Sequence, residues 1–313
     1  MDRRAWGLLL ILGAIWGASY LFIKIGVRDL SPAMVAWLRV MLAALILVPL
    51  AMRRGGLPNL RGTLPVLVLL GAVQVAGPFL LIAAGEEEIS SSLAGILVTS
   101  APLFTALLAI WVDHEERSTG LRGVGIAAGF GGVVLLLGVD LGGSGSELLG
   151  GAAVVLAGLG YSVGGFIAKR RLTDAPPLSI AAAVMVASSV LLAPVGLATL
   201  PASTPGIGPL AAVTALGVLG TGVAFAIFYS LIGWVGPART FIVTYIAPAF
   251  AVGYGAFFLD EAITVATVAG LALIVGGSWL AAGGVSVAEE PASVGEEAAT
   301  GGPAELSLGD HAS

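Results

Sequence analysis

The sequence contains no cysteine, two histidines and very little charge for its length. Charged residues make up 11% of the 313 positions and hydrophobic residues 58%, whereas a soluble domain is about one quarter charged. The absence of cysteine excludes disulfides, thiolate metal sites and cysteine nucleophiles, and it leaves the redox compartment open. The shortage of charge excludes water as the main solvent of the folded chain.

What the sequence has instead is a series of long apolar runs. A helix needs roughly 20 apolar residues to cross the hydrocarbon core, and ten such runs are separated by charged, Pro/Gly or Ser/Thr clusters. We therefore expect an all-α polytopic membrane protein with ten transmembrane helices. The predicted spans are 5–25, 32–52, 64–84, 91–112, 121–139, 148–168, 177–199, 209–232, 237–259 and 264–282.

The positive charges of the loops predict the orientation. With the N-terminus inside, eleven of the fourteen Lys and Arg residues lie in the cytoplasm, as the positive-inside rule requires. Both ends of the chain are then cytoplasmic, and we expect a multi-pass protein of the cell inner (plasma) membrane. Residues 286–313 are rich in Glu, Gly, Ser and Ala and are predicted to form a disordered acidic cytoplasmic tail.

The two halves of the chain match each other at a nearly constant offset. Lys24 and Lys169 are 145 residues apart, and Pro102 and Pro248 are 146 apart. Such an ordered series indicates a fused duplication, with a first five-helix repeat at 1–142 and a second at 143–285. Because five is odd, the second repeat enters the membrane in the opposite sense, and the two are inverted.

Inverted repeats are typical of secondary transporters that work by alternating access, with the solute site near the midplane. We therefore expect a small-molecule solute and the lipid bilayer as partners, no nucleic acid, no metal or other cofactor, and a monomer or weak homodimer. A channel or facilitator is the alternative, although no ring of pore charges is visible. An intramembrane enzyme is less favoured, because the spans offer no Cys or His.

Several short motifs follow one another along each half. They are Trp16-Gly17-Ala18-Ser19-Tyr20, 32–39, Ser100-Ala101-Pro102-Leu103-Phe104, 125–132, Gly236-Pro237-Ala238-Arg239, Tyr245-Ile246-Ala247-Pro248, Leu259-Asp260-Glu261 and 270–277. Together they resemble the EamA family of the drug/metabolite transporter superfamily. The resemblance implies ten helices, inverted five-helix repeats, a central cavity, and export of amino acids or other small metabolites.

Ionisable groups within the predicted spans are rare, and each costs about 2.5–3.5 kcal/mol at the bilayer centre on insertion scales. Arg39 is either a counter-ion for an anionic solute or a packing residue bonded to backbone carbonyls. Glu86 lies with Glu87 and Glu88 at the outer end of the third span. It either couples transport to protons or belongs to a solvated acidic rim. Gln74 either faces the cavity or bridges two helices.

Charged residues at the helix ends have simpler interpretations. Lys24 and Lys169 occupy equivalent ends, where interfacial anchoring is favoured. We expect Glu261 to cap the helix that follows it, and Glu115 or Glu116 to do the same in the first half. Proton coupling is the alternative.

Two prolines and a set of aromatic residues complete the predicted site. Pro102 and Pro248 lie mid-helix at equivalent positions, where each removes a backbone hydrogen bond; they mark either broken helices at the solute site or inert kinks. The aromatic residues suit either an apolar cavity or the core. The candidate solute-binding residues are Trp16, Tyr20, Arg39, Gln74, Phe79, Ser100, Pro102, Tyr161, Phe225, Tyr229, Tyr245 and Pro248, with Glu86 for proton coupling and no catalytic residue.

Overall fold

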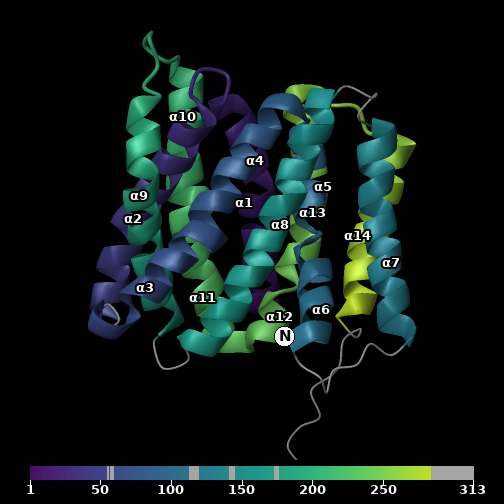
Figure 1. The fold of residues 1–313 in the computed structure, drawn as a ribbon, viewed down its shortest axis with the longest axis horizontal. Coiled ribbons are helices and arrows are strands. Elements are labelled where there is room, and N and C mark those ends of the chain that lie inside the picture. The colour runs from purple at the N-terminus through teal and green to yellow at the C-terminus, as the bar shows by residue number, and fades with distance from the viewer. Residues whose placement is uncertain (55, 57–59, 113–119, 141–144, 173–175, 283–313) are drawn as a thin grey trace, which may run out of the picture.

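The computed structural model describes residues 1–54, 56, 60–112, 120–140, 145–172 and 176–282. All regular structure in these ranges is helical (Figure 1). The first half contains α1 (Arg3–Gly26), α2 (Pro32–Arg53), α3 (Leu60–Leu70), η1 (Gly71–Ala76), α4 (Gly77–Glu88), α5 (Ser91–Val98), α6 (Ala101–Val112), α7 (Gly120–Leu135) and η2 (Leu136–Asp140). The second half contains α8 (Gly145–Arg171), α9 (Pro177–Ala198), α10 (Ile207–Ala215), η3 (Leu216–Val223), α11 (Ala224–Val235), α12 (Pro237–Thr240), α13 (Val243–Leu259) and α14 (Val265–Ala281). The η segments are π-helical.

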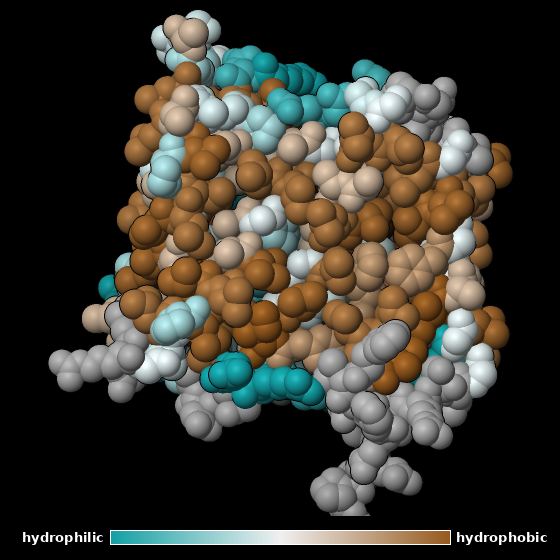
Figure 2. Space-filling view, viewed as in Figure 1, coloured by the Kyte–Doolittle hydropathy of each residue, from teal (hydrophilic) through white to brown (hydrophobic). Residues whose placement is uncertain are grey.

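The helices form an upright bundle with an apolar outer surface. Among the described residues, eight helical stretches are long and apolar enough to cross a membrane, and the apolar helices α13 and α14 are shorter, at 17 residues each. Figure 2 shows a broad hydrophobic belt between polar groups at the two ends of the bundle. A surface of this kind is stable only in lipid, so the chain is an all-helical polytopic membrane protein.

Several predicted span edges change in the structure. The third span runs without a break through α3, η1 and α4 to Glu88, beyond its predicted end. The eighth span is likewise continuous through α10, η3 and α11. The predicted disordered tail at 286–313, and Glu115 and Glu116, lie outside the described residues.

The contacts between the two halves come in matched sets. The second helices of the two halves, α2 and α9, pack against each other, and the fifth helices, α7 and α14, do the same. The first helix of one half packs on the third and fourth helices of the other: α1 on α10, α11 and α13, and α8 on α4, α5 and α6. A two-fold axis between the halves would produce this exchange of partners. Figure 1 shows α7 and α14 side by side at one edge, and α2 with α9 at the other.

Glycines allow the closest of these helix pairs to meet. A Cβ added to Gly277 of α14 would lie 2.5 Å from the backbone nitrogen of Gly129 in α7, and one on Gly125 would lie 2.6 Å from that of Ala281. On α1, a Cβ at Gly17 would lie 2.8 Å from the carbonyl oxygen of Ala247. Small residues at membrane helix interfaces let backbones approach in this way. They explain much of the unusual glycine content.

Candidate functional site

Arg39 lies at the meeting point of three helical elements. It projects from α2 with only 7% of its surface exposed. Its Nε donates a hydrogen bond of 2.8 Å to Oγ1 of Thr221 in η3, and its guanidinium carbon lies 3.6 Å from the ring centroid of Phe79 in α4. In the described part of the chain the guanidinium makes no other hydrogen bond and no ion pair with a carboxylate. The guanidinium therefore makes no described bond to the backbone carbonyls that the packing interpretation required, and it packs on Thr221 and Phe79 instead.

The partner of Arg39 is held by an irregular stretch of helix. Thr221 is fully buried in the π-helical segment η3, and its hydroxyl donates to the carbonyl oxygen of Leu216 at 3.1 Å. The other half has a π-helical segment, η1, at the matching place, since Gly71 and Gly217 are 146 residues apart. Single π turns within α-helices occur frequently at functional sites.

Gln74 belongs to η1 and lies against α8. A Cβ added to Gly164 of α8 would collide with the Cβ and Cγ of Gln74. This contact brings Gln74 to the interface between two spans, as the helix-bridging interpretation requires. No described hydrogen bond of its amide identifies a partner across that interface.

Several of the predicted aromatic side chains pack together beside Arg39. Phe79, Tyr161, Phe225 and Tyr229 belong to one hydrophobic cluster, and Phe79 is the member that lies against the guanidinium. The ring centroid of Phe225 lies 6.2 Å from that of Trp16 and 6.0 Å from that of Tyr229. Tyr20 packs against two other clusters. The structure therefore joins predicted aromatic residues of both halves in one cluster next to a buried cation.

The predicted helix break of the first half is present. α5 ends at Val98 and α6 begins at Ala101, directly before Pro102. The hydroxyl of Ser162 in α8 donates to the carbonyl oxygen of Ala101 at 2.6 Å, and Ser278 of α14 donates to that of Thr99 at 3.3 Å.

Ser100 lies at the centre of this break. It is fully buried, and its Oγ has no hydrogen-bond partner among the described residues. A buried hydroxyl without a partner is costly. It is a group that a bound solute can satisfy.

The corresponding prediction for the second half is wrong. α13 continues through Pro248, and the break lies earlier, at Phe241 and Ile242 between α12 and α13. Pro248 is buried within α13, and Tyr245 is partly exposed on the same helix. No described hydrogen bond or ring contact joins either residue to Arg39. The two halves are therefore not broken at matching positions.

Glu86 is buried, in contrast to its two acidic neighbours. It is 0% exposed and neither carboxyl oxygen has a hydrogen-bond partner among the described residues, whereas Glu87 and Glu88 are exposed. The acidic-rim interpretation is thus wrong for Glu86, because α4 continues to Glu88 and turns Glu86 inward. The backbone carbonyl oxygen of Glu86 accepts a hydrogen bond from Nζ of Lys24.

Lys24 binds a helix end within the bundle. Its Nζ donates to the backbone carbonyl oxygens of Glu86 at 2.5 Å and Ile89 at 2.9 Å. A cation at these carbonyls compensates the negative end of α4. Lys169, its counterpart, is exposed at the end of α8. Interfacial anchoring stays a prediction for both residues.

Glu261 caps a helix, but not the one that follows it in the chain. Its carboxylate accepts hydrogen bonds from the backbone nitrogens of Ser91 at 2.7 Å and Ser92 at 2.9 Å, and from the Ser92 hydroxyl at 2.5 Å. It thereby caps α5 of the first half, while Thr264 caps α14. A Cβ on Gly255 would collide with Glu261 and Ser92, so that glycine makes room for the contact. With Lys24, this carboxylate joins α1, α4, α5 and α13 at one end of the bundle.

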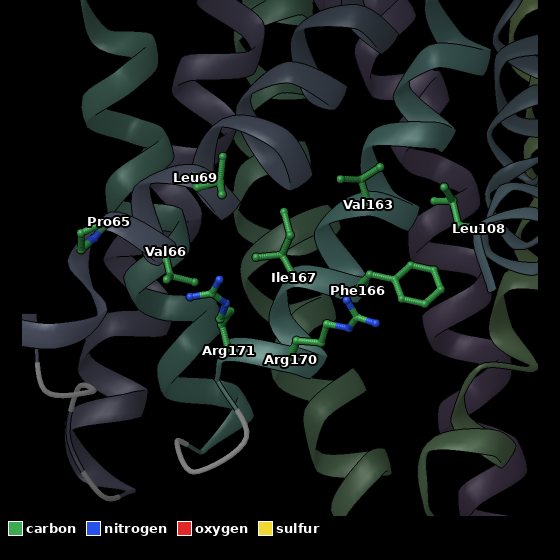
Figure 3. Close-up of a pocket in the computed structure, with 9 residues that line it drawn as sticks. All are labelled: Pro65, Val66, Leu69, Leu108, Val163, Phe166, Ile167, Arg170 and Arg171. Carbon is green, nitrogen blue, oxygen red and sulfur yellow. The ribbon is translucent and has the colours of Figure 1, made fainter. Parts of the chain in front are cut away.

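A pocket lies at the opposite end of the bundle. It has a volume of about 470 Å³ and lies between α3, α6 and α8 (Figure 3). None of the predicted site residues lines it. The described residues contain no cluster of three His, Cys, Asp or Glu side chains that could hold a metal ion.

A family model matches the chain twice, over residues 4–138 and 148–283, and it describes the EamA-like transporter family. The chain belongs to the EamA-like transporter family. It is a membrane transporter, and it resides in the inner membrane as a multi-pass protein. The two matches fall on the two halves whose contacts are described above.

Curated relatives of this EamA-like chain extend along most of its length. The "Uncharacterized inner membrane transporter YedA" of Escherichia coli is 30% identical over 276 residues, covering 86% of this chain and 87% of the relative. A "Probable amino-acid metabolite efflux pump" of E. coli is 24% identical, covering 88% and 94% of the two chains. A "Probable terminal-alkyne amino-acid exporter" of Streptantibioticus cattleyicolor is 26% identical, covering 88% and 92%.

A crystal structure shares the fold of this EamA-like transporter. It superposes with a TM-score of 0.65 at 23% identity and covers 90% of this chain and 98% of that chain. At this identity the match supports the arrangement of the helices alone.

Three polar groups that the structure of this EamA-like transporter singles out were not predicted. Thr221 binds Arg39, Ser92 binds Glu261, and the indole Nε1 of Trp37 is buried without a described partner. A polar residue inside an apolar run would have pointed to Thr221. No sequence signal pairs Ser92 with a carboxylate 169 residues away.

Proposed function

We propose that this EamA-like transporter exports amino acids or similar small metabolites by alternating access. In this proposal ten spans form two inverted repeats, 1–142 and 143–285, with both ends of the chain in the cytoplasm. The exchange of helix partners between the halves and the doubled family match support this arrangement. Figure 1 also has the start of α1 and the end of α14 at the same end of the bundle.

The observation that carries the proposal is a buried guanidinium that has no carboxylate partner in the part of the chain that the structure describes. Arg39 is held by one hydrogen bond and one aromatic face, so its Nη donors can bind the carboxylate of a solute in the bidentate geometry that arginine favours. The aromatic cluster supplies an apolar surface for a side chain. Since all these groups come from one chain, a monomer suffices.

The solute class is inferred from two relatives and from this site. The names of two relatives refer to amino-acid metabolites and to a terminal-alkyne amino acid, and an amino acid carries a carboxylate. An apolar amino acid matches both the cation and the aromatic surface at Arg39. We therefore expect leucine and phenylalanine to be better solutes than acidic or basic amino acids.

Transport into everted membrane vesicles tests the proposed function. Vesicles that contain the protein should accumulate labelled leucine or phenylalanine above vesicles without it, and leucinamide, which lacks the carboxylate, should compete poorly. Absence of accumulation for every proteinogenic amino acid, with and without a proton gradient, would contradict amino-acid export. Equal competition by leucinamide would remove the role given to Arg39.

We further propose that Glu86 couples export to protons. A buried carboxyl without a hydrogen-bond partner keeps its charge only at high cost, and neither carboxyl oxygen of Glu86 has a partner among the described residues. Inward movement of protons drives export only if the proton and the solute occupy the protein in alternation. In this proposal Glu86 takes up a proton after the solute has left at the outer end, and it releases the proton before the next solute binds.

Replacement of Glu86 by Gln should uncouple the protein. The amide has nearly the shape of the carboxyl but cannot bind and release a proton, so exchange of leucine for leucine should persist while a proton gradient should no longer raise accumulation above the level reached without a gradient. The exposed neighbour Glu87 gives the matched control, Glu87→Gln. Gradient-driven accumulation at the normal rate in Glu86→Gln would exclude Glu86 as the coupling group.

The contacts of Lys24 and Glu261 support a bundle that is closed at the end opposite the N-terminus. Lys24 joins α1 to the end of α4, and Glu261 joins α13 to the start of α5. In the proposed cycle these contacts break when the site opens at that end. Three charge-assisted hydrogen bonds to one carboxylate are strong enough to define a discrete closed state.

A further inference from the structure

The pocket between α3, α6 and α8 is lined by apolar side chains, with two arginines at one end. Figure 3 shows side chains of α3, α8 and α6 forming the wall, with Arg170 and Arg171 below them at the end of α8. The wall consists of Pro65, Val66, Leu69, Leu108, Val163, Phe166 and Ile167. Leu69 is 47% exposed although it lies within a membrane span. The pocket is thus open enough for an apolar occupant.

Arg170 and Arg171, the two arginines that line the pocket, are available to a ligand. Both are exposed, and neither makes a hydrogen bond or an ion pair with a described residue. They line the pocket, whereas Lys169, in the same turn of α8, does not. The pocket volume of about 470 Å³ falls within the range of about 300–1,000 Å³ that ligand sites occupy.

We propose that this pocket binds an anionic phospholipid from the leaflet at the N-terminal end of the bundle. An acyl chain lies against α3, α6 and α8, and the phosphate binds Arg170 and Arg171. The order of the groups is the order of a lipid in a leaflet: apolar toward the membrane centre and cationic toward the water. Basic pockets between membrane helices bind anionic headgroups in this way. This inference does not depend on the transported solute.

Native mass spectrometry of the purified full-length protein tests the proposal. The protein is mixed with equal amounts of phosphatidylglycerol and phosphatidylcholine, and the retained lipid is counted. We expect preferential retention of phosphatidylglycerol, reduced about fivefold by Arg170→Gln or Arg171→Gln and about thirtyfold by both, from about 1 kcal/mol for each cation. Lys169→Gln is the matched control and should retain the lipid normally.

Two further probes separate the lipid from other anions. Val163→Trp fills the apolar wall without changing the arginines and should also reduce phosphatidylglycerol binding, whereas glycerol phosphate, a headgroup without chains, should bind far more weakly than the lipid. Equal retention of the two lipids, or an equal loss in Lys169→Gln, would overturn the proposal in favour of general surface attraction. Binding of glycerol phosphate as tight as that of the lipid would overturn it in favour of a soluble anion.

Discussion

Replacing Arg39 by alanine should reduce leucine transport by about 100-fold. Removing one member of a buried charge pair costs about 2–5 kcal/mol, and about 3 kcal/mol corresponds to about 100-fold. The loss should fall on solutes with a carboxylate, because the guanidinium has no carboxylate partner among the described residues. Uptake of leucine into everted vesicles, compared at equal amounts of inserted wild-type and Arg39→Ala protein, measures the reduction.

A second readout separates solute binding by Arg39 from a structural role. The wild type should discriminate leucine from leucinamide, and Arg39→Ala should lose that discrimination along with the rate. Thr221→Val removes the hydroxyl, and with it the hydrogen bonds to Nε of Arg39 and to the carbonyl oxygen of Leu216. It should reduce transport much less, since the charge remains. If Arg39→Ala keeps the preference for leucine, or transports at the normal rate, the solute carboxylate binds elsewhere.

Replacing Glu261 by alanine should destabilise the protein by about 3 kcal/mol. The carboxylate satisfies two backbone nitrogens and one hydroxyl at the start of α5, and both serines there are buried. Each buried group left without a partner costs about 1–3 kcal/mol, and such losses are not additive. Reversible unfolding in mixed detergent micelles measures the difference.

The neighbour of Glu261 provides the control. Asp260 is exposed and has a positive φ of 54°, a conformation that asparagine also tolerates. Asp260→Asn should therefore unfold like the wild type. A wild-type stability for Glu261→Ala would mean that the carboxylate does not hold the two halves together.

The sequence predicted the large features of this fold because the membrane imposes them. Apolar runs of membrane length predicted the membrane-spanning helices. One edge differs, because α4 continues to Glu88, where Lys24 binds the carbonyl oxygens at the helix end. That extension of the helix is what buries Glu86. A single charge deep in an apolar run was enough to identify Arg39.

The contacts between the halves could not be predicted in the same way. Glu261 was expected to cap the next helix, but its partner Ser91 is 170 residues away, and only the folded bundle brings them together. The π-helical segments have no distinctive sequence, so Thr221 was missed. Pro248 was misleading, because a proline within a membrane helix does not have to break it.

The central claim is that the two ends of the bundle open in alternation around Arg39. Because the chain lacks cysteine, pairs of spin labels can be introduced at exposed positions without other changes. One pair at Glu87 and Ile263 reports on the end that holds Glu261, and one at Lys169 and Arg239 reports on the other end. Their distance distributions, measured by pulsed electron resonance with and without leucine, should shift in opposite directions. Distances that lengthen together at both ends, as in a channel, or that stay fixed in protein that transports leucine, would contradict the account.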